Sequence, residues 1–554
     1  MALLAGGCKK PESEKSGSDK VETGKATPAT SSQPAIALSI LYGSEKKTWL
    51  EEQIAAFNAS GATTKAGGRI EVTGKAIGSG EAMTAILDGS EKPVIFSPAS
   101  GAYITLLDQR WQTKTNSPKP LAPAGEPLVL SPIVIAMWKP MAEALGWPGK
   151  PIGWKDILEV SKNSKGWGAF GRPEWGEMKL GHTHPEYSNS GLLSVLAIAY
   201  AGAGTQRGLT AAELPKVEPF MAKVEDAVVH YGKSTGFFAD KMIERGPTYL
   251  SAAVLYENLV IESYQRAQKP ALPLVAIYPV EGTFWSDHPF SVLDAAWVKP
   301  ADREAAAVFL AYLKAKPAQE RALALGFRPV DPGIKIGAPI DAAHGVDAQQ
   351  PQTLLEVPDG PTLDTLLATF RKTKKVADVV FVFDKSGSMV GRPLEEAKLG
   401  AKAFLDTLDA RDQVTLIFFD NNIYPAFGPV EVGKAKAELA QRIDGVSAGG
   451  ETAVYDAIRR AYELLAARTP AAAHRIRAIV AMTDGADNKS THSADQLRAL
   501  LKGENRAATV FTIGYGDGAN RDVLEALASD GGGSFSEGSV DSIIQVYRDL
   551  ASFF

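Results

Sequence analysis

The sequence predicts an α/β protein in which helices cover both faces of parallel sheets. Short apolar runs alternate with helical patterns from residue 35 onward, which is typical of strand–helix–strand units. In the last third, runs such as Val379–Phe383 are apolar at every position, as in strands buried on both faces. A length of 554 residues corresponds to three or four compact bodies at about 150 residues each.

Composition excludes several classes of protein. Hydrophobic residues make up 45% and charged residues 22%, which excludes a fibrous or wholly disordered chain. A net charge of −5 gives no electrostatic footprint for nucleic acid. No apolar run reaches the roughly 18 residues of a membrane-spanning helix. The single cysteine, Cys8, excludes a disulfide framework and a cysteine metal cluster within one chain.

The N-terminus suggests processing and lipid attachment. Small residues precede Cys8 in Leu4-Ala5-Gly6-Gly7, and a peptidase cleft accepts such extended backbone readily. The stretch resembles the end of a bacterial lipoprotein signal, although Ala5 stands where Leu is commoner. The resemblance implies a signal remnant at 1–8, lipidation of Cys8, and membrane contact through that anchor alone. Residues 9–34 are rich in Lys, Glu, Ser, Pro and Thr, and we expect a flexible tether.

The region 35–350 begins with three strand-to-helix units, each joined by small residues. Gly and Ser at such turns leave backbone N–H groups open to a ligand, and in an open sheet these turns line one crevice. The expected strands are 35–42, 70–77 and 94–96, and the helices are 45–60, 81–87 and 102–110. Three such turns in succession predict a ligand cleft.

The whole region resembles a type II bacterial extracellular solute-binding protein, near the molybdate- and phosphate-receptor branch. The resemblance implies two α/β lobes that close over a solute, with lobe one at 35–127 and 290–350 and lobe two at 128–289. The chain would cross between lobes at 128–138 and 290–298. The stretches that carry the resemblance are Gly78–Gly80, Phe96–Ser100, Ser131–Trp138, Gly181–Thr183, Ser188–Gly191 and Gly326–Pro329.

Candidate solute contacts come from both lobes. They are Ser44, Ser79, Gly80, Ser97, Ser100, Ser188, Ser190 and Tyr249, the last expected to open an apolar helix with Ser251. A cleft made only of donors favours an oxyanion such as phosphate, sulfate or molybdate. Glu281 and Asp287, if they face the cleft, favour an amine or a hydroxylated solute instead, so the sequence leaves the solute class open.

A histidine pair in lobe two is a candidate zinc site. His182 and His184 are two residues apart, and Glu186 could complete a ligand set. Pro185 interrupts any strand there and no distant further ligand stands out. A packing role is therefore favoured over zinc.

A Pro-rich stretch at 351–375 suggests a linker, and strand–helix alternation restarts in a domain at 376–554. The expected strands are 379–383, 414–419, 477–482 and 509–513, and the helices are 393–408, 454–467, 521–528 and 541–551. Such a doubly wound, Rossmann-like sheet brings the carboxyl ends of its strands to one edge.

Five oxygen-bearing side chains follow strand ends in this domain: Asp384, Ser386, Ser388, Thr452 and Asp484. An all-oxygen site with few carboxylates suits Mg²⁺ or Mn²⁺. The set resembles the metal-ion-dependent adhesion site of von Willebrand factor A domains. The resemblance implies direct ligation by the three hydroxyls, direct or water-mediated roles for the two acids, and a partner that offers Asp or Glu to the metal.

The sequence thus predicts a periplasmic-binding-protein-like module followed by a von Willebrand factor A domain. We expect a lipid-anchored bacterial envelope protein, facing the periplasm or the cell surface, that captures a small solute and binds a protein partner. Its alternatives are the receptor of an ABC-type importer with an accessory A domain, and a sensor or scaffold with no solute. We expect no enzyme, because neither a Walker-type motif nor a nucleophile-elbow motif occurs. Metal-dependent hydrolysis is a weak hypothesis, because no general base stands out near the expected metal site.

Overall fold

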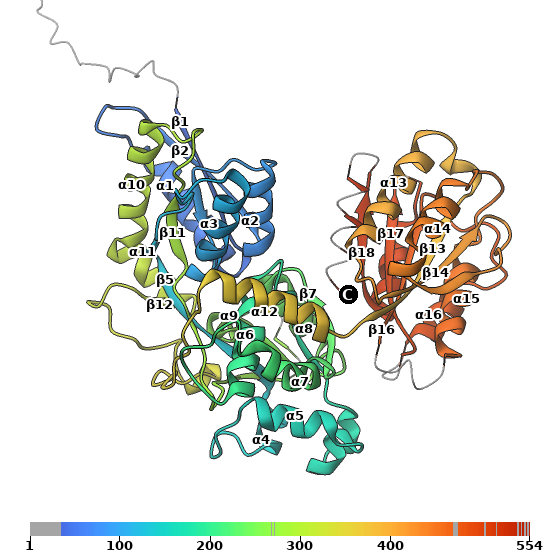
Figure 1. The fold of residues 1–554 in the computed structure, drawn as a ribbon, viewed down its shortest axis with the longest axis horizontal. Coiled ribbons are helices and arrows are strands. Elements are labelled where there is room, and N and C mark those ends of the chain that lie inside the picture. Colours follow the sequence, from blue (N-terminus) through green and yellow to red (C-terminus); the bar gives the residue numbers. More distant parts are fainter. Residues whose placement is uncertain are drawn as a thin grey trace, which may run out of the picture.

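The computed structural model describes residues 35–554 except 268, 271, 469–474, 503–505, 517, 540–541, 544–545, 548–549, 551–552 and 554. The expected signal remnant, Cys8 and the tether lie outside the described residues. Within the described residues the strands form three sheets, and the predicted α/β class is confirmed (Figure 1). No helix in this part of the chain is long and apolar enough to cross a bilayer.

Lobe one is built on a five-stranded sheet of order β2-β1-β3-β11-β4, in which β1, β2 and β3 run parallel and β11 and β4 complete an antiparallel edge. Its strands are β1 (Ile36–Gly43), β2 (Ile70–Ile77), β3 (Ile95–Ser97), β4 (Glu126–Pro127) and β11 (Pro289–Val292), and its helices are α1 (Lys47–Ser60), α2 (Ser79–Asp88), α3 (Gly101–Thr115), α10 (Pro300–Lys314) and α11 (Lys316–Ala324). The carboxyl ends of β1, β2 and β3 face lobe two.

Lobe two has the order β10-β5-β8-β6-β7, with β9 and β12 also paired to β5. Its strands are β5 (Val129–Trp138), β6 (Leu180–Thr183), β7 (Val228–Gly232), β8 (Ala252–Tyr256), β9 (Leu274–Ile277), β10 (Trp285–Ser286) and β12 (Arg328–Pro329), and its helices are α4 (Lys139–Ala144), α5 (Trp154–Lys162), α6 (Asn189–Ala203), α7 (Leu214–Glu225), α8 (Thr235–Arg245) and α9 (Glu257–Gln265). The outgoing crossing lies between β4, which pairs with β11, and β5, which pairs with β8 and β10.

Two boundaries differ from the sequence prediction. The return crossing lies between β10, which pairs with β5, and β11, which pairs with β3, a few residues before the predicted 290–298. The tail assigned to lobe one, up to residue 350, does not stay there. After α11 the chain pairs β12 with β5, and the Gly345 carbonyl accepts from Ala276 N in β9 (2.8 Å).

The prediction of a helix that begins at Tyr249 is also wrong. Residues 252–256 form β8, and α9 begins only at Glu257. A five-residue apolar run is too short for periodicity to distinguish a strand from a helix. This run is central in the sheet, between β5 and β6.

The predicted linker 351–375 contains a helix that packs on both lobes, α12 (Gly360–Thr373) (Figure 1). Asp359 caps it by accepting from Thr362 N (2.9 Å), and Pro361 occupies its first turn, where proline is well tolerated. The buried residues Leu363, Leu366, Leu367 and Phe370 lie on one face at helical spacing.

The contacts of α12 join the two lobes. Near its start, Asp364 accepts from Gln109 Nε2 (2.7 Å) and Arg110 (3.0 Å) on α3 of lobe one. Near its end, the ring of Phe370 meets His184 and Tyr231 of lobe two edge-on, with centroids 5.2 and 5.8 Å away. This helix is therefore part of the solute-binding module.

The C-terminal domain has a six-stranded sheet of order β15-β14-β13-β16-β17-β18, parallel except for β15. Its strands are β13 (Ala377–Asp384), β14 (Gln413–Phe419), β15 (Phe427–Glu431), β16 (Ile476–Thr483), β17 (Thr509–Tyr515) and β18 (Gly532–Gly538), and its helices are α13 (Arg392–Thr407), α14 (Val432–Asp444), α15 (Val454–Ala466), α16 (Ala494–Leu501) and α17 (Arg521–Asp530). Alternate residues of β13 enter different core clusters, because helices cover both faces.

Replacing Phe370 by Ala should weaken the solute-binding module. The ring is fully buried beneath α12, and removing a buried aromatic side chain costs about 3–5 kcal/mol. Urea unfolding should show this loss in Phe370→Ala. Lys372→Ala, on the exposed side of the same helix, should stay within about 0.5 kcal/mol of the wild type. Equal, small effects from both changes would mean that α12 does not pack as described.

Candidate functional site

The two lobes touch directly at the carboxyl edge of the lobe-one sheet. Gly80 N and Glu81 N, at the start of α2, donate to the Tyr187 carbonyl of lobe two (3.0 and 3.2 Å). The Tyr103 hydroxyl donates to the Pro185 carbonyl (2.5 Å), and Gly236 N donates to Ser44 Oγ (3.3 Å). The amides expected to face an anion at α2 are thus bound to a carbonyl of the opposite lobe.

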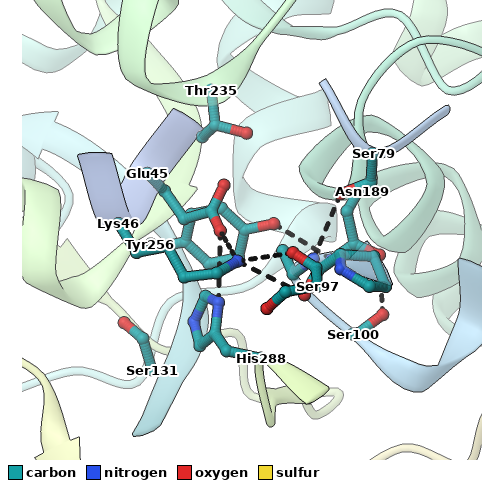
Figure 2. A network of polar contacts seen from close by, with 12 residues as sticks. Glu45, Lys46, Ser79, Ser97, Ser100, Ser131, Asn189, Thr235, Tyr256 and His288 are labelled. Carbon is teal, nitrogen blue, oxygen red and sulfur yellow. Dashed lines mark hydrogen bonds and ion pairs between the residues drawn. The ribbon is translucent and has the colours of Figure 1, made fainter. Parts of the chain in front are cut away.

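A buried ionic cluster occupies the centre of this interface (Figure 2). Lys46 Nζ donates to Glu45 Oε1 (3.0 Å), to the Ser97 carbonyl (2.9 Å) and to the Pro98 carbonyl (3.4 Å). Glu45 Oε1 also lies 3.1 Å from His288 Nδ1. Lys46 and His288 are fully buried and Glu45 is 6% exposed, so water does not screen these charges.

The protonation states follow from the contacts. Burial opposes ionisation of Glu45, but Lys46 and the His288 hydrogen bond outweigh it and lower the pKa of Glu45 to about 2. Burial also lowers the pKa of His288, more than the hydrogen bond to Glu45 raises it. Near neutral pH Glu45 is therefore ionised and His288 is neutral. Because the carboxylate can only accept, His288 carries its proton on Nδ1, and Nε2 is left as an acceptor.

Two polar atoms at this centre have no partner in the described part of the chain: Ser97 Oγ and His288 Nε2. Both residues are fully buried, and such groups are normally hydrogen-bonded. His288 also has a left-handed backbone (φ 44°), rare for a residue with a side chain, at the crossing between the lobes. The unpartnered Nε2 needs a donor that the described residues do not supply.

The remaining wall is a chain of hydroxyl and amide groups (Figure 2). Ser100 Oγ donates to Asn189 Oδ1 (2.6 Å), and Asn189 Nδ2 donates to the Tyr256 hydroxyl (3.0 Å). Ser188 Oγ and Ser190 Oγ lie 3.0 and 2.8 Å from Thr235 Oγ1. These contacts join α3 and α6 across the cleft and tie α6 to the start of α8.

The structure brings most of the expected solute residues together. Ser79, Ser97, Ser100, Ser188 and Ser190 line the interface, while Ser44 and Gly80 serve direct contacts between the lobes. Tyr249 is a correction: it stacks on His230 (centroids 4.4 Å apart), at the end of β8 away from the cleft. The aromatic residue of the cleft is Tyr256, at the opposite end of that strand.

Sequence reasoning missed Glu45, Lys46, Asn189, Thr235, Tyr256 and His288. Glu45 and Lys46 directly follow the Gly43-Ser44 turn, and Asn189 lies between two expected serines, so position along the chain could have found them. His288 carried no such signal. Of the two acids considered for the cleft, Asp287 accepts from Gly101 N (3.1 Å) at the start of α3, and Glu281 accepts from Trp154 N (3.1 Å) at the start of α5.

The histidine pair of lobe two serves packing. His182 Nε2 contacts Glu225 (3.2 Å), which also accepts from the Tyr231 hydroxyl (2.7 Å), and Glu186 pairs with Arg371 of α12. Among the described residues, no group of three or more His, Cys, Asp or Glu is arranged to hold a metal ion.

The second candidate site is the carboxyl edge of the C-terminal sheet. Ser386 N donates to Asp384 Oδ1 (2.7 Å), and Thr483 Oγ1 donates to Asp384 Oδ2 (2.5 Å). Ser388 Oγ donates to Asp484 Oδ1 (2.6 Å) and lies 3.1 Å from Ser386 Oγ. A Cβ built on Gly485 would lie 3.4 Å from Thr452 Oγ1 and 3.6 Å from Ser388 Oγ, so both hydroxyls lie beside this glycine.

The charge state of this edge suits a cation. Burial, with a smaller contribution from Asp484, raises the pKa of Asp384 to about 6, and burial raises the pKa of Asp484. The neighbouring acids have other partners: Asp420 pairs with Lys385 (2.5 Å), and Asp487 accepts from Tyr455 N (3.1 Å) at the start of α15. The five expected oxygen donors fit a hard divalent cation.

Comparisons with known proteins match both modules. Residues 38–328 match the family described as bacterial extracellular solute-binding protein, and residues 378–548 match the von Willebrand factor type A domain. An uncharacterized protein from Synechocystis sp. is 31% identical over 29% of this chain and 37% of its own length, so this chain spans little more than a third of that relative.

Solved structures match each module separately. The periplasmic binding protein AfuA from Actinobacillus pleuropneumoniae, with fructose-6-phosphate bound, is 14% identical over 62% of this chain and 99% of its own, with a TM-score of 0.43. A von Willebrand factor type A protein from Catenulispora acidiphila is 20% identical over 32% of this chain and 42% of its own, with a TM-score of 0.28.

Lowering the pH from 7 to 5.5 should destabilise the protein. Burial holds the pKa of His184, His230 and His288 below the ordinary 6.5, so below pH 6.5 the unfolded chain binds protons that the folded chain does not. Each should cost at most about 1 kcal/mol of unfolding free energy at pH 5.5. His182, whose pKa is raised despite its burial because Glu225 pairs with it, works in the opposite direction, as does Asp384, whose pKa burial raises to about 6.

Urea unfolding at the two pH values measures this loss, and His288→Gln isolates one contribution. The variant should lose less unfolding free energy than the wild type between pH 7 and pH 5.5, by at most about 1 kcal/mol. An unchanged pH dependence in the variant would contradict a neutral His288.

Proposed function

The chain belongs to the family of bacterial extracellular solute-binding proteins and carries a von Willebrand factor A domain. We propose that it captures a small polar solute between its lobes. We also propose that it binds a protein partner through a metal ion in the A domain. Both are typically non-catalytic binding modules, so no catalytic residue is proposed. Homologues of the solute-binding domain are periplasmic or extracellular. We place the protein at the bacterial envelope, held by a lipid on Cys8.

The observation that carries the solute proposal is the acceptor at His288 Nε2. A fully deprotonated oxyanion such as sulfate or molybdate has no hydrogen to donate to it, whereas a hydroxyl or an amine does. Two carboxylates, Glu45 and Asp287, stand close to Lys46 and to the start of α3, where an anion would bind. They repel an oxyanion. A neutral hydroxylated solute or an amine is therefore the proposed solute class, in preference to an oxyanion.

Thermal unfolding against a solute panel tests this proposal. A sugar, polyol or amine at a hundred times its Kd should stabilise the protein by about 2.7 kcal/mol. Ser97→Ala removes one unpartnered hydroxyl of the cleft and should reduce that stabilisation. Ser161→Ala, whose hydroxyl binds the Leu158 carbonyl on α5, is the matched control and should retain it.

Two outcomes would contradict the solute proposal. One is that no sugar, polyol or amine stabilises the protein. The other is an oxyanion whose stabilising effect disappears in Ser97→Ala, since that result would place an anion in the cleft.

For the A domain we propose that Mg²⁺ or Mn²⁺ binds at Asp384, Ser386, Ser388, Thr452 and Asp484. A cation held mostly by hydroxyls stays electrophilic and supplies a coordination position for an Asp or Glu carboxylate of the partner. The surrounding chain orients these groups, since Thr483 holds Asp384 and Ser388 holds Asp484. The hydrogen-bonded cluster of hydroxyls and carboxylates supports this proposal.

Metal binding should depend on Ser386. Mg²⁺ or Mn²⁺ should raise the Tm of the wild type, because the cation neutralises two buried carboxylates. Ser386→Ala should remove most or all of that rise in Tm. Thr407→Ala removes a hydroxyl at the far end of α13, bound to the Phe404 carbonyl, and should leave the rise unchanged. Partner binding that persists in chelator would contradict a metal-dependent contact.

A second candidate is a sensor or scaffold, and α12 favours it over a transport receptor. An importer receptor must open to release its solute. Opening this module would break the contacts that α12 makes with both lobes, through Asp364 on one side and Phe370 on the other. A module held closed in this way is suited to reporting its state to the A domain that follows.

A further inference from the structure

A cavity of about 330 Å³ lies between lobe two and the amino-terminal edge of the A-domain sheet. It is on the opposite edge of that sheet from the candidate metal site and outside the interlobe cleft. Its lining carries five cationic side chains and, among the lining residues that the structure describes, the single carboxylate of Glu177. The cations are Lys179, Lys375, Arg475, Arg477 and Arg506.

Neutral carbonyl oxygens position several of these cations. Lys179 Nζ donates to the Thr248 carbonyl (2.7 Å), and Lys375 Nζ donates to the Asp226 carbonyl (3.1 Å). Arg475 Nη1 donates to the Ala377 and Arg411 carbonyls (3.0 and 3.1 Å). Lys375 also lies close to the carboxylates of Asp226 and Glu177, which raise its pKa against the effect of burial. Among the lining residues that the structure describes, five cations face one carboxylate.

A half-buried histidine in the wall is consistent with this positive potential. His230 stacks on Tyr249, and its pKa is lowered to about 3, first by burial and then by Arg245, Arg506, Lys179 and Lys375. Its imidazole stays neutral beside the cations. The same cations that disfavour its protonated form favour an anion in the neighbouring space.

We propose that this cavity binds a small multivalent oxyanion of the phosphate class. The volume is that of a small-molecule site, and converging guanidinium and ammonium groups are the donors that bind phosphate oxygens most strongly. Lys179 comes from lobe two and Arg475 from the A domain, so one anion contacts both modules. The site shares no lining residue with the cleft or the metal edge and is independent of the proposed function.

Calorimetric titration of the full chain with inorganic phosphate and pyrophosphate, at constant ionic strength, tests this site. The wild type should bind pyrophosphate more tightly than phosphate. The double variant Lys179→Gln/Lys375→Gln keeps a donor at both positions but removes two charges. It should bind pyrophosphate at least about tenfold more weakly, because a charge-assisted hydrogen bond accounts for roughly a decade of affinity.

Two control variants separate this cavity from other parts of the protein. Lys372→Gln, exposed on α12 and outside the lining, should bind pyrophosphate like the wild type. Ser97→Ala, in the interlobe cleft, should also bind it normally. Equal affinity in the double variant and the wild type, or a loss confined to Ser97→Ala, would overturn the proposal, while the separate assays for solute and metal would be unaffected.

Discussion

The contact between the Glu45 carboxylate and the Lys46 ammonium is the interaction on which the cleft depends. Two charges removed from water need close partners, and here the partners come from several segments. Lys46 uses the Ser97 and Pro98 carbonyls of its own lobe, while Asn258 of lobe two donates to the Glu45 carbonyl (3.2 Å). The Asn258 contact thus adds a hydrogen bond between the lobes at the backbone of this pair. Burial keeps His288 neutral, because it lowers the pKa of the imidazole more than the hydrogen bond to Glu45 raises it.

The A domain connects to this closed module through a short covalent path. Helix α12 ends at Thr373, Lys375 lines the basic cavity, and β13 begins at Ala377. Seven residues later, Asp384 stands at the carboxyl edge among the candidate metal ligands. Because β13 is buried throughout and central in its sheet, it is a rigid connection between the two edges. Helix α12, the cavity lined by Lys375 and the sheet edge that carries Asp384 therefore follow one another along a single stretch of chain.

Sequence patterns predicted the parts of this molecule that local rules govern. The strands of the A domain could be predicted because residues such as Val379–Phe383 are apolar at every position. The serines of the cleft could be predicted because they follow strand ends. The linker prediction failed because the prolines of 351–361 outweighed the helical spacing of Leu363, Leu366 and Phe370. His288 could not be found, since it meets Glu45 across 243 positions, and no local pattern encodes such a contact. Charges buried by tertiary packing are set by the whole fold.

The solute class follows from the same buried pair. An anionic solute that approached Lys46 would have to displace Glu45 or share the site with it. Displacement leaves a carboxylate in the interior without its partner, and sharing places two negative charges side by side, so both are strongly unfavourable. A hydroxyl or an amine avoids both costs: it donates to His288 Nε2 and accepts from, or donates to, Ser97 Oγ while the ion pair stays intact. The cleft thereby discriminates by the charge it already contains, whereas the proposed phosphate-class anion binds beyond the end of α12, where the cations of the cavity outnumber its carboxylate.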